Sequence, residues 1–231
     1  MSSTLKIDWA THEAAKHACE NWHYSKCIPK CKLVKIGVWE NSKFVGVVIF
    51  SYGATPNLMS PYGMQMQEGC ELTRVALSKH TTPVSRILSI ALRFLKKSNP
   101  GLRLVVSYAD RDQLHHGGIY QATNWIYVGV SNKGGRSAFI IKGKKTHPRV
   151  VGLKGGTQSI DWVRKHLDPN ATEFRTNGKH KYLFPLDDKM RQRILPLARP
   201  YPKRAGSIVV DVPAIHAGEG GAEPTPALHS L

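Results

Sequence analysis

The pattern of apolar and polar positions predicts short strands and amphipathic helices in alternation over residues 1–131. Strands are expected where apolar residues alternate or run continuously, and helices where they recur every three or four residues after a capping residue. The expected strands are 5–9, 32–39, 43–52, 70–78, 102–108 and 125–130, and the expected helices are 11–21, 84–97 and 118–123. The resulting order, β-α-β-β-β-α-β-α-β, is typical of an α/β (α+β) fold in which a mixed sheet carries helices on both faces.

The pattern weakens after residue 131. Short strands over 137–142 and 149–152, a helix over 160–166 and a basic helix over 189–195 are expected there. The stretch GEGGAEPTPA near the end is low in complexity and predicts a flexible segment. We therefore divide the chain into a core over 1–131, a basic C-terminal extension packed on it over 132–204, and a flexible tail over 205–231.

The positive charge is concentrated in the extension. The chain has 33 Lys and Arg against 16 Asp and Glu, a net charge of +17, and 18 of the basic but only 5 of the acidic residues lie within 132–204. Aromatic residues are interleaved with these cations, which predicts a nucleic-acid surface rather than a solvated basic face, because cations bind phosphates and flat rings stack on bases. The candidate backbone contacts are Lys133, Arg136, Lys142, Lys144, Lys145, Lys179, Lys181, Lys203 and Arg204.

Simpler features argue against several classes of protein. No run of 18 apolar residues is present, and the first residues lack the apolar segment of a signal peptide, so we expect neither a membrane protein nor a secreted one. Four cysteines in 231 residues do not suggest a disulfide framework. The expectation is a cytoplasmic protein with a polyanionic partner.

The densest group of polar side chains lies within residues 107–125. The apolar strand predicted before it delivers Tyr108 and Asp110 at its carboxyl end, where α/β proteins collect the polar groups of their sites. A short helix with Tyr120 and the following Asn124 comes next. Asp110 could instead cap that helix, and Tyr120 could be an ordinary core residue. The abrupt change from apolar residues to Asp-Arg-Asp favours a catalytic site.

A second group combines Glu71 and Arg74, in the strand over 70–78, with Ser85 at the start of the next helix. Strict alternation places Glu71 and Arg74 on opposite faces, and either an internal salt bridge or the lining of a site would explain them. A helix start at Ser85 can bind an anion. However, residues 79–84 contain no glycine, so the usual backbone cradle for a coenzyme A pyrophosphate is not expected.

The histidines and cysteines of residues 17–31 do not have the spacing of a metal site. They lack a Cys-x2-Cys pair, and Pro29 prevents one helix from presenting them together. The adjacent Trp22, His23 and Tyr24 could stack on a base, shuttle a proton, or only pack against the protein. We keep these three as candidate base-binding residues and expect no metal ligands.

Seven strings of the sequence are long or specific enough to compare with known families, namely WHYSKCIP (22–29), WENSKFVGVVIFSYGATPNL (39–58), CELTRVAL (70–77), TPVSRILSIALRFLK (82–96), SYADRDQLHHGGIYQATNWIYVG (107–129), KHKYLFPLD (179–187) and YPKR (201–204). Together they resemble the Mom DNA-modification proteins of Mu-like phages, over about residues 20–204. Their length predicts a close relationship within that family. The expected strand order is also the one used by GNAT acyltransferases, in which a donor enters between two splayed strands.

The resemblance implies a GNAT-like fold and an enzyme that works in the host cytoplasm on double-stranded DNA. It implies conversion of adenine to N6-(carbamoylmethyl)adenine, which shields phage DNA from host restriction. The N6 amine is a poor nucleophile and is hidden in the base stack. The adenine must therefore be flipped into a pocket, where a basic group accepts the N6 proton.

The candidate residues suit these tasks. Asp110 would accept the N6 proton, with Asn124 positioning it, and Tyr120 would protonate the leaving group, as a tyrosine does in GNAT-like enzymes. Ser85 would anchor the donor. The remaining candidates would line the cleft, stack on the flipped base or shuttle protons, and they are Glu71, Arg74, Tyr108, Trp22, His23, Tyr24 and His116.

The atoms of that product constrain the donor. Acetyl transfer would leave the base without its second nitrogen, whereas glycyl transfer gives an isomer of the product that a rearrangement can convert. An activated glycyl group on glycyl-tRNA is therefore favoured, which would make tRNA a second polyanionic partner. The alternative is acetyl-CoA, with iron or zinc as a bound metal.

Other functions compete with this interpretation. An N6-adenine methyltransferase is disfavoured, because the chain lacks both an Asp/Asn-Pro-Pro-Tyr/Phe element and a glycine-rich methyl-donor loop. A non-catalytic nucleic-acid-binding protein would explain the charge but not the polar group at residues 107–125. An acetyltransferase acting on proteins or small amines agrees with the fold alone. A monomer and a dimer both agree with the sequence.

Overall fold

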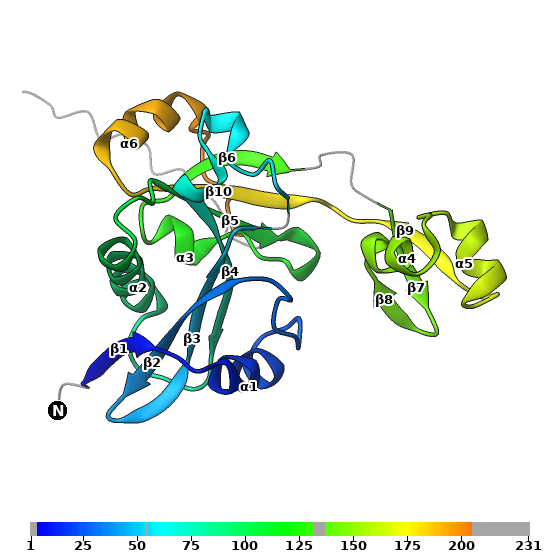
Figure 1. Cartoon of the computed structure of the whole chain (residues 1–231), viewed down its shortest axis with the longest axis horizontal. Coiled ribbons are helices and arrows are strands. Elements are labelled where there is room, and N and C mark those ends of the chain that lie inside the picture. The colour runs from blue at the N-terminus through cyan, green and yellow to red at the C-terminus, as the bar shows by residue number, and fades with distance from the viewer. Residues whose placement is uncertain (1–3, 54, 132–136, 205–231) are drawn as a thin grey trace, which may run out of the picture.

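A seven-stranded mixed sheet forms the body of the protein. The computed structural model describes residues 4–53, 55–131 and 137–204 (Figure 1). The strand order is β1-β2-β3-β4-β5-β10-β6, with β4 and β5 parallel and every other neighbouring pair antiparallel. The strands of this sheet are β1 Leu5–Trp9, β2 Leu33–Glu40, β3 Lys43–Ser51, β4 Gly69–Leu77, β5 Leu104–Asp110, β6 Ile126–Ser131 and β10 Lys179–Pro185.

Helices cover both faces of this sheet, as the sequence predicts. The helix α1 (His12–Trp22) packs on one face over β2, β3 and β4. The helices α2 (Val84–Ser98) and α3 (Gly118–Gln121) pack on the other face (Figure 1). A further helix, α6 (Asp188–Ile194), covers the end of the sheet formed by β5, β10 and β6. The predicted mixed sheet with flanking helices is therefore confirmed.

Local sequence explains why α1 and α2 form. Thr11 caps α1, and its hydroxyl accepts a 3.1 Å hydrogen bond from the backbone N–H of Ala14. Pro83 immediately precedes α2, and Lys96 lies in the last turn, near the negative end of the helix dipole. The buried positions of α2 recur every three or four residues, which gives it one apolar face toward the sheet, and they are Ile87, Leu88, Ala91, Leu92 and Leu95.

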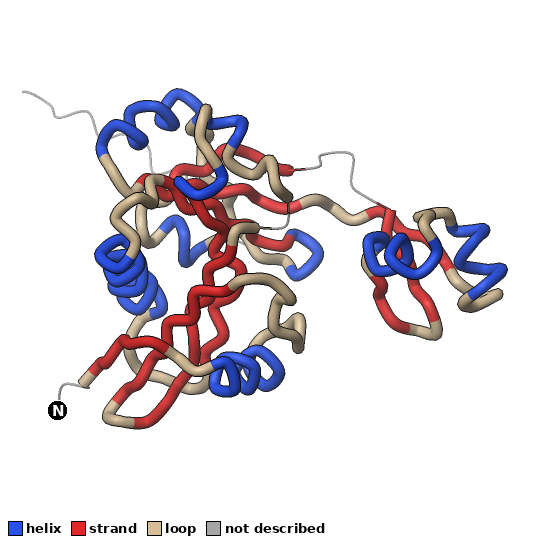
Figure 2. Tube along the Cα trace, viewed as in Figure 1, coloured by secondary structure: helices blue, strands red, loops and turns tan. Residues whose placement is uncertain are grey.

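Residues 137–175 form a second, smaller unit inserted between β6 and β10. It contains a three-stranded sheet in the order β8-β7-β9 and two helices. Figures 1 and 2 show this unit standing to one side of the large sheet, next to the start of β10. It has its own small core, formed by Phe139, Val151, Val163 and Ala171. Its elements are β7 Ser137–Ile141, β8 Lys144–Thr146, α4 Pro148–Gly155, α5 Ile160–His166 and β9 Thr172–Arg175.

The insertion changes how the chain is divided. The sequence assigns all of residues 132–204 to one extension, but β10 pairs with both β5 and β6 inside the large sheet. Tyr182 and Leu183 of β10 are both fully buried, because both faces of the sheet are covered there. The chain therefore leaves the large sheet at the end of β6, forms the basic small unit, and returns to the large sheet at β10. The tail over 205–231 lies outside the described residues.

One predicted element is wrong in type. Residues 149–152 are expected as a strand but lie in α4. Pro148 occupies the first helical position, where its missing N–H costs nothing. Val151 is buried against the small sheet while Val150 is half exposed, so one helical face packs and the other is open. Tertiary packing thus overrides the strand preference of the two valines. None of the described helices is long and apolar enough to cross a membrane.

Candidate functional site

The carboxyl end of β5 and the start of β10 bring opposite charges together. Asp110 and Lys179 face each other in the antiparallel register, and Asp110 Oδ2 lies 3.7 Å from Lys179 Nζ. Asp110 Oδ1 accepts a 3.0 Å hydrogen bond from the backbone N–H of Asp112. The carboxylate therefore caps the short turn that follows β5. It also remains partly open to solvent, because the Asp110 side chain is 18% exposed.

The loop after α1 lies beside this carboxylate. Burial raises the pKa of Tyr24, and the negative charge of Asp110 raises it further, which places the phenol within electrostatic reach of Asp110. The Tyr24 side chain is nevertheless 49% exposed, and its ring contacts the His115 ring edge-on with centroids 5.4 Å apart. Of the three aromatic candidates in this loop, Tyr24 offers an accessible ring, and this ring lies against His115, whose backbone N–H donates to the Asp110 carbonyl.

The two residues before Tyr24 are turned inward. Trp22 packs against the core between α1 and the sheet. His23 is buried, and its Nδ1 accepts a 3.1 Å hydrogen bond from the backbone N–H of Ser25, so the neutral ring carries its proton on Nε2. Burial lowers the pKa of His23 to about 4, assisted by the positive charge of Arg74. His23 is therefore a neutral imidazole at pH 7.

A buried tyrosine lies where β4 and β5 part. The two strands pair only as far as Leu72 and Ser107, although both continue. Ser107 Oγ lies 2.8 Å from the Leu72 carbonyl oxygen and 2.8 Å from the Tyr120 hydroxyl oxygen. Because the carbonyl can only accept, Ser107 donates to Leu72 and Tyr120 donates to Ser107. Burial raises the pKa of Tyr120 to about 12, so this phenol keeps its proton at neutral pH.

A glycine turn sets the position of α3 and hence of Tyr120. Gly117 has a φ of +84°, and a Cβ added there would lie 2.4 Å from the Tyr182 ring. Only glycine allows this close approach in this conformation. The Tyr182 hydroxyl donates a hydrogen bond to the His116 carbonyl, which ties the turn to β10. His116 is half buried beside this contact.

A β-bulge in β4 overturns the expected arrangement of Glu71 and Arg74. Leu72 and Arg74 pair with consecutive residues of β3, so Thr73 is the extra residue. Leu72 faces the core on the α2 side, whereas Ile49, the partner of Arg74, faces the core on the α1 side. Arg74 and Glu71 therefore share the α1 face. The prediction of opposite faces is wrong, because a bulge shifts the alternation by one residue.

The surroundings of Lys181 differ from those predicted for a contact to the nucleic-acid backbone. It lies opposite Tyr108 in the sheet, and its ammonium sits over two rings, 5.1 Å from the Tyr62 centroid and 5.9 Å from the Tyr108 centroid. Burial lowers the pKa of Lys181, while the charge of Glu71 opposes that shift. Burial also raises the pKa of Tyr108 to about 12. Lys181 thus belongs to a half-buried polar group beneath the site rather than to the exposed surface.

The start of α2 already holds a negative charge. Ser85 lies in the first turn of α2 and is half buried. In the turn before it, the carboxylate of Glu40 accepts hydrogen bonds from the backbone N–H groups of Thr81 and Thr82, each at 2.8 Å. The free N–H groups at the start of α2 itself, where an incoming anion would bind near Ser85, follow directly after this turn. The protein therefore supplies its own anion at this helix start.

Asn124 does not reach the carboxylate that it is expected to position. It is exposed, has a φ of +59°, and closes the turn after α3 by donating its backbone N–H to the Gln121 carbonyl. The next strand begins at Ile126. Leu183 of β10 pairs with Ile126 on one side and with Val106 of β5 on the other, so Ile126 and Val106 lie at the same height in the sheet. Val106 is four residues before Asp110, about 13 Å along the strand. An Asn is explained here by its tolerance of positive φ.

Most of the candidate backbone cations are exposed. Several lie in or beside the β7–β8 hairpin of the small unit, and others lie at the start of β10 or at the end of the described chain. Lys145 Nζ lies 3.6 Å from Asp112 Oδ2, which links the small unit to the turn after β5. Lys133 and Arg136 lie outside the described residues. The exposed candidates are Lys142, Lys144, Lys145, Lys179, Lys203 and Arg204.

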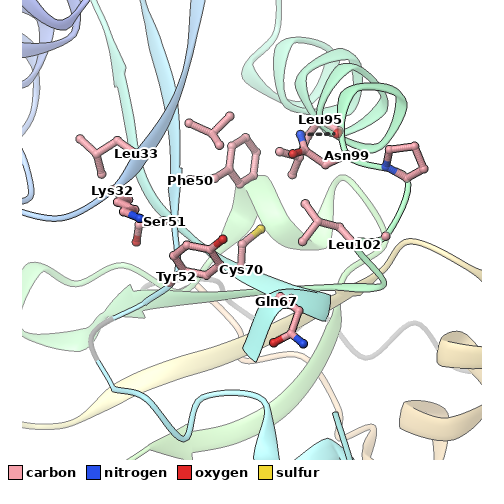
Figure 3. A pocket seen from close by; sticks show the side chains of 14 residues that line it. Lys32, Leu33, Phe50, Ser51, Tyr52, Gln67, Cys70, Leu95, Asn99 and Leu102 are labelled. Atoms are coloured by element: carbon pink, nitrogen blue, oxygen red, sulfur yellow. Dashed lines mark hydrogen bonds between the residues drawn. The ribbon is translucent and has the colours of Figure 1, made fainter. Parts of the chain in front are cut away.

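A cavity of about 390 Å³ lies at the opposite end of the sheet from Asp110 (Figure 3). Its walls come from the start of β2, the end of β3, the start of β4, the carboxyl end of α2 and the loop after α2, including Phe50, Cys70 and Leu95. From Leu104 to Asp110 the strand advances about 20 Å. Burial raises the pKa of the Cys70 thiol to about 12, so it is protonated at neutral pH. The cavity is thus separate from the polar group around Asp110.

The cysteines of the chain are dispersed. Cys19 and Cys70 are buried, whereas Cys27 and Cys31 are exposed. Within residues 4–53, 55–131 and 137–204, no three His, Cys, Asp or Glu side chains lie close enough together to hold a metal ion.

Sequence reasoning missed two residues that shape this region. Ser107 connects Tyr120 to β4, and its signal is a polar residue inside the apolar run LVVSYA. Glu40 binds the turn before α2 from 42 residues away, and nothing in its local sequence indicates that partner. Tyr24 lies within electrostatic reach of Asp110, Arg74 and Tyr120, and Glu71 lies within reach of Tyr120 and Tyr108. Alternation along β5 places Asp110 and Tyr120 on opposite faces of that strand. Asn124, Trp22 and Ser85 lie outside this group.

Comparisons with known proteins cover most of the chain. The chain is similar to the methylcarbamoylase mom of Escherichia phage Mu, with 24% identity over 210 residues that cover 87% of this chain and 85% of that protein. This identity is lower than the long strings predict, so the two proteins are diverged relatives. A model of the Mom protein family matches residues 4–203. The chain therefore belongs to the Mom protein family.

Proposed function

We propose that this protein is a phage DNA-modification enzyme that transfers an activated group to N6 of an adenine flipped out of the duplex. Family membership and the name of the phage Mu relative support DNA modification. The observation that carries the chemistry is the place of Tyr24 where β4 and β5 part. Its exposed ring contacts His115, whose backbone N–H is bonded to Asp110, and it lies within electrostatic reach of both the Asp110 carboxylate and the buried Tyr120 hydroxyl. The product in this proposal is N6-(carbamoylmethyl)adenine, which protects the DNA from restriction.

Each of these three groups has a task in the transfer. The flipped adenine stacks on Tyr24, and its N6 attacks the carbonyl carbon of the donor while Asp110 accepts the N6 proton. The bond from that carbon to the leaving oxygen or sulfur breaks, and Tyr120 supplies the leaving group with a proton. Ser107 donates its own proton to the Leu72 carbonyl and accepts from Tyr120, so it holds the phenol in place, and solvent returns a proton to the phenolate after the leaving group departs. The protons balance, because Asp110 releases the N6 proton to solvent and the proton that Tyr120 gives to the leaving group is replaced from solvent.

A GNAT-like fold is part of this proposal. Two observations support it: the place of β10 between β5 and β6, and the loss of pairing between β4 and β5 beyond Leu72 and Ser107. In such a fold the donor lies between the parting strands. Tyr120, on the helix after β5, then lies beside the leaving group.

We favour a glycyl donor carried on tRNA. Glycyl transfer yields N6–CO–CH2–NH2, which has the same atoms as N6–CH2–CO–NH2, so an intramolecular rearrangement completes the product without a further reagent. The Glu40 carboxylate on the Thr81 and Thr82 amides argues against a coenzyme A pyrophosphate at the start of α2, because two anions would repel there. The net charge of +17 suits a second polyanion.

Substitution of Asp110 tests the site. We expect Asp110→Asn to abolish modification of plasmid DNA in expressing cells, measured by mass spectrometry of the digested DNA, and to leave DNA affinity within about threefold. Asp8→Asn, at an exposed aspartate of β1, is the control and retains modification. Loss of DNA binding together with modification would show that Asp110 is structural.

Reconstitution tests the donor. Purified protein, DNA and cell extract are supplied with isotope-labelled glycine, with and without ribonuclease. Incorporation of label that ribonuclease abolishes supports a glycyl-tRNA donor. Modification from acetyl-CoA and an amine source with no RNA present would reject it and establish the coenzyme A alternative.

A further inference from the structure

An exposed leucine stands in a strained conformation at the edge of the candidate site. Leu114 ends the turn after β5, is 84% exposed and has a φ of +57°. A branched side chain is unfavourable in this region of backbone space, where Gly and Asn are favoured. Because the side chain is exposed, it also contributes little hydrophobic stabilisation to the fold. Neither packing nor backbone geometry explains a leucine here, and such an outlier is a signal of function.

The turn that carries Leu114 is held firmly to the site. The backbone N–H of Leu114 donates to the Arg111 carbonyl at 3.0 Å, and the N–H of His115 donates to the Asp110 carbonyl at 3.0 Å. The Asp110 carboxylate caps the same turn through the N–H of Asp112. The Leu114 side chain is therefore projected into solvent from a backbone that is bonded directly to the proposed proton acceptor.

The surroundings of Leu114 have the charge of a DNA-binding surface. Arg111 is exposed, and its Nη1 donates to the Asn177 carbonyl at 2.6 Å. Lys145 and Lys179 approach the same turn through Asp112 and Asp110, at 3.6 and 3.7 Å. Three cations against the two carboxylates of Asp110 and Asp112 leave this edge with a net positive charge. An apolar tip beside such cations suits a duplex, because cations bind phosphates and the tip can enter the base stack.

We propose that Leu114 is a wedge that enters the base stack of duplex DNA and occupies the space vacated by the extruded adenine. This rests on the proposed function and adds the element that drives extrusion. Flipping costs a few kcal/mol of stacking and pairing, and an apolar side chain inserted between base steps offsets part of that cost. A fixed tip next to Asp110 would couple insertion of the wedge to delivery of the base to the carboxylate.

A pre-extruded substrate separates a wedge from a general binding residue. Purified wild type, Leu114→Ala and Leu153→Ala are compared in cell extract as the donor source, with modified adenine measured by mass spectrometry. Leu153 lies on α4 and is 83% exposed, so it controls for loss of an exposed leucine. One DNA is fully paired, and the other has the same adenines mispaired with cytosine, which lowers the cost of flipping.

We expect Leu114→Ala to modify the paired DNA at least tenfold more slowly than wild type and the mispaired DNA within about threefold of wild type. Leu153→Ala should match wild type on both. Equal losses on the two DNAs, or no loss on paired DNA, would overturn the wedge. Failure of wild type to modify either DNA would instead overturn the proposed function.

A stability measurement excludes a folding defect. Leu114→Gly removes the strain of the positive φ and the side chain together, so its melting temperature should equal or exceed that of wild type. It should show the same selective loss on paired DNA. A lower melting temperature for Leu114→Gly would show that Leu114 supports the fold, and would contradict the proposal.

Discussion

The Glu40 carboxylate binds Thr82 at two points, accepting a 2.8 Å hydrogen bond from its backbone N–H and a 2.6 Å hydrogen bond from its hydroxyl. It also accepts from the backbone N–H of Thr81. These bonds, led by that of the Thr82 hydroxyl, lower the pKa of Glu40 to about 2. A residue at the end of β2 thereby joins the hairpin to the turn before α2, and it gives that turn a permanent negative charge.

Removal of this charge should weaken the fold in a pH-dependent way. The pKa of Glu40 is lowered on folding, so its stabilising effect is complete above the ordinary value of 4.5 and is lost as pH falls toward 2. Glu40→Gln should lower the free energy of unfolding at pH 7. On acidification, this free energy should fall less for Glu40→Gln than for wild type. Urea unfolding at pH 7, 5 and 3 measures both, with exposed Glu20 replaced by Gln as control. Parallel curves for wild type and Glu40→Gln would contradict this.

Tyr120→Phe should separate catalysis from packing. The ring contacts with Trp125 and Tyr182 remain, while the hydrogen bond to Ser107 is lost, so stability falls by about 1 kcal/mol. Loss of a proton donor to the leaving group lowers modification by about 10²- to 10⁴-fold.

Tyr127→Phe is the matched control for Tyr120→Phe. It removes another buried phenol, which is bonded to His180 Nδ1 at 2.9 Å, and should cost similar stability with modification retained. Denaturant unfolding and mass spectrometry of DNA report the two effects. Equal losses of modification in both variants would exclude a specific role for the Tyr120 hydroxyl.

His23 should make the protein sensitive to mild acid. Its pKa is lowered from 6.5 to about 4 by burial, so between these values the unfolded chain binds a proton that the folded protein does not. Stability therefore falls as pH drops from 6.5 toward 4. His23→Gln should flatten this dependence, whereas replacement of the exposed His12 should leave it unchanged. Unfolding in urea at pH 7, 5.5 and 4.5 is the measurement, and an unchanged slope in His23→Gln would refute the assignment.

The small unit should contribute salt-dependent DNA affinity. Lys144 is exposed in the β7–β8 hairpin, and one phosphate contact adds about 0.9 to the slope of log affinity against log salt. Lys144→Gln should reduce the slope by about that amount on any DNA sequence. Lys97→Gln, at the exposed end of α2, should not change it. Fluorescence anisotropy at several salt concentrations gives the slopes, and equal slopes for the two variants would place the DNA elsewhere.

Several features of the fold follow from local sequence. The order of elements up to Ser131 can be predicted because capping residues, alternation and helical periodicity are each confined to a few neighbouring positions. The α5 helix over Ile160–His166 is predicted for the same reason. The concentration of polar residues at the end of β5 also follows, since a strand that changes abruptly from apolar to charged residues ends at a surface.

Long-range geometry decided the rest. β10 pairs into the sheet 48 residues after β6 ends. Thr73 is a bulge because the pairing of β3 with β4 shifts by one residue there. Glu40 bonds to Thr82, which is 42 residues away in the sequence. The sequence by itself determined the elements, the charge and the residues available for chemistry, because these depend on composition and near neighbours. Only the tertiary structure decided which side chains meet, because a partner across the sheet depends on strand pairing, and one extra residue in a strand reverses the face on which each following side chain lies.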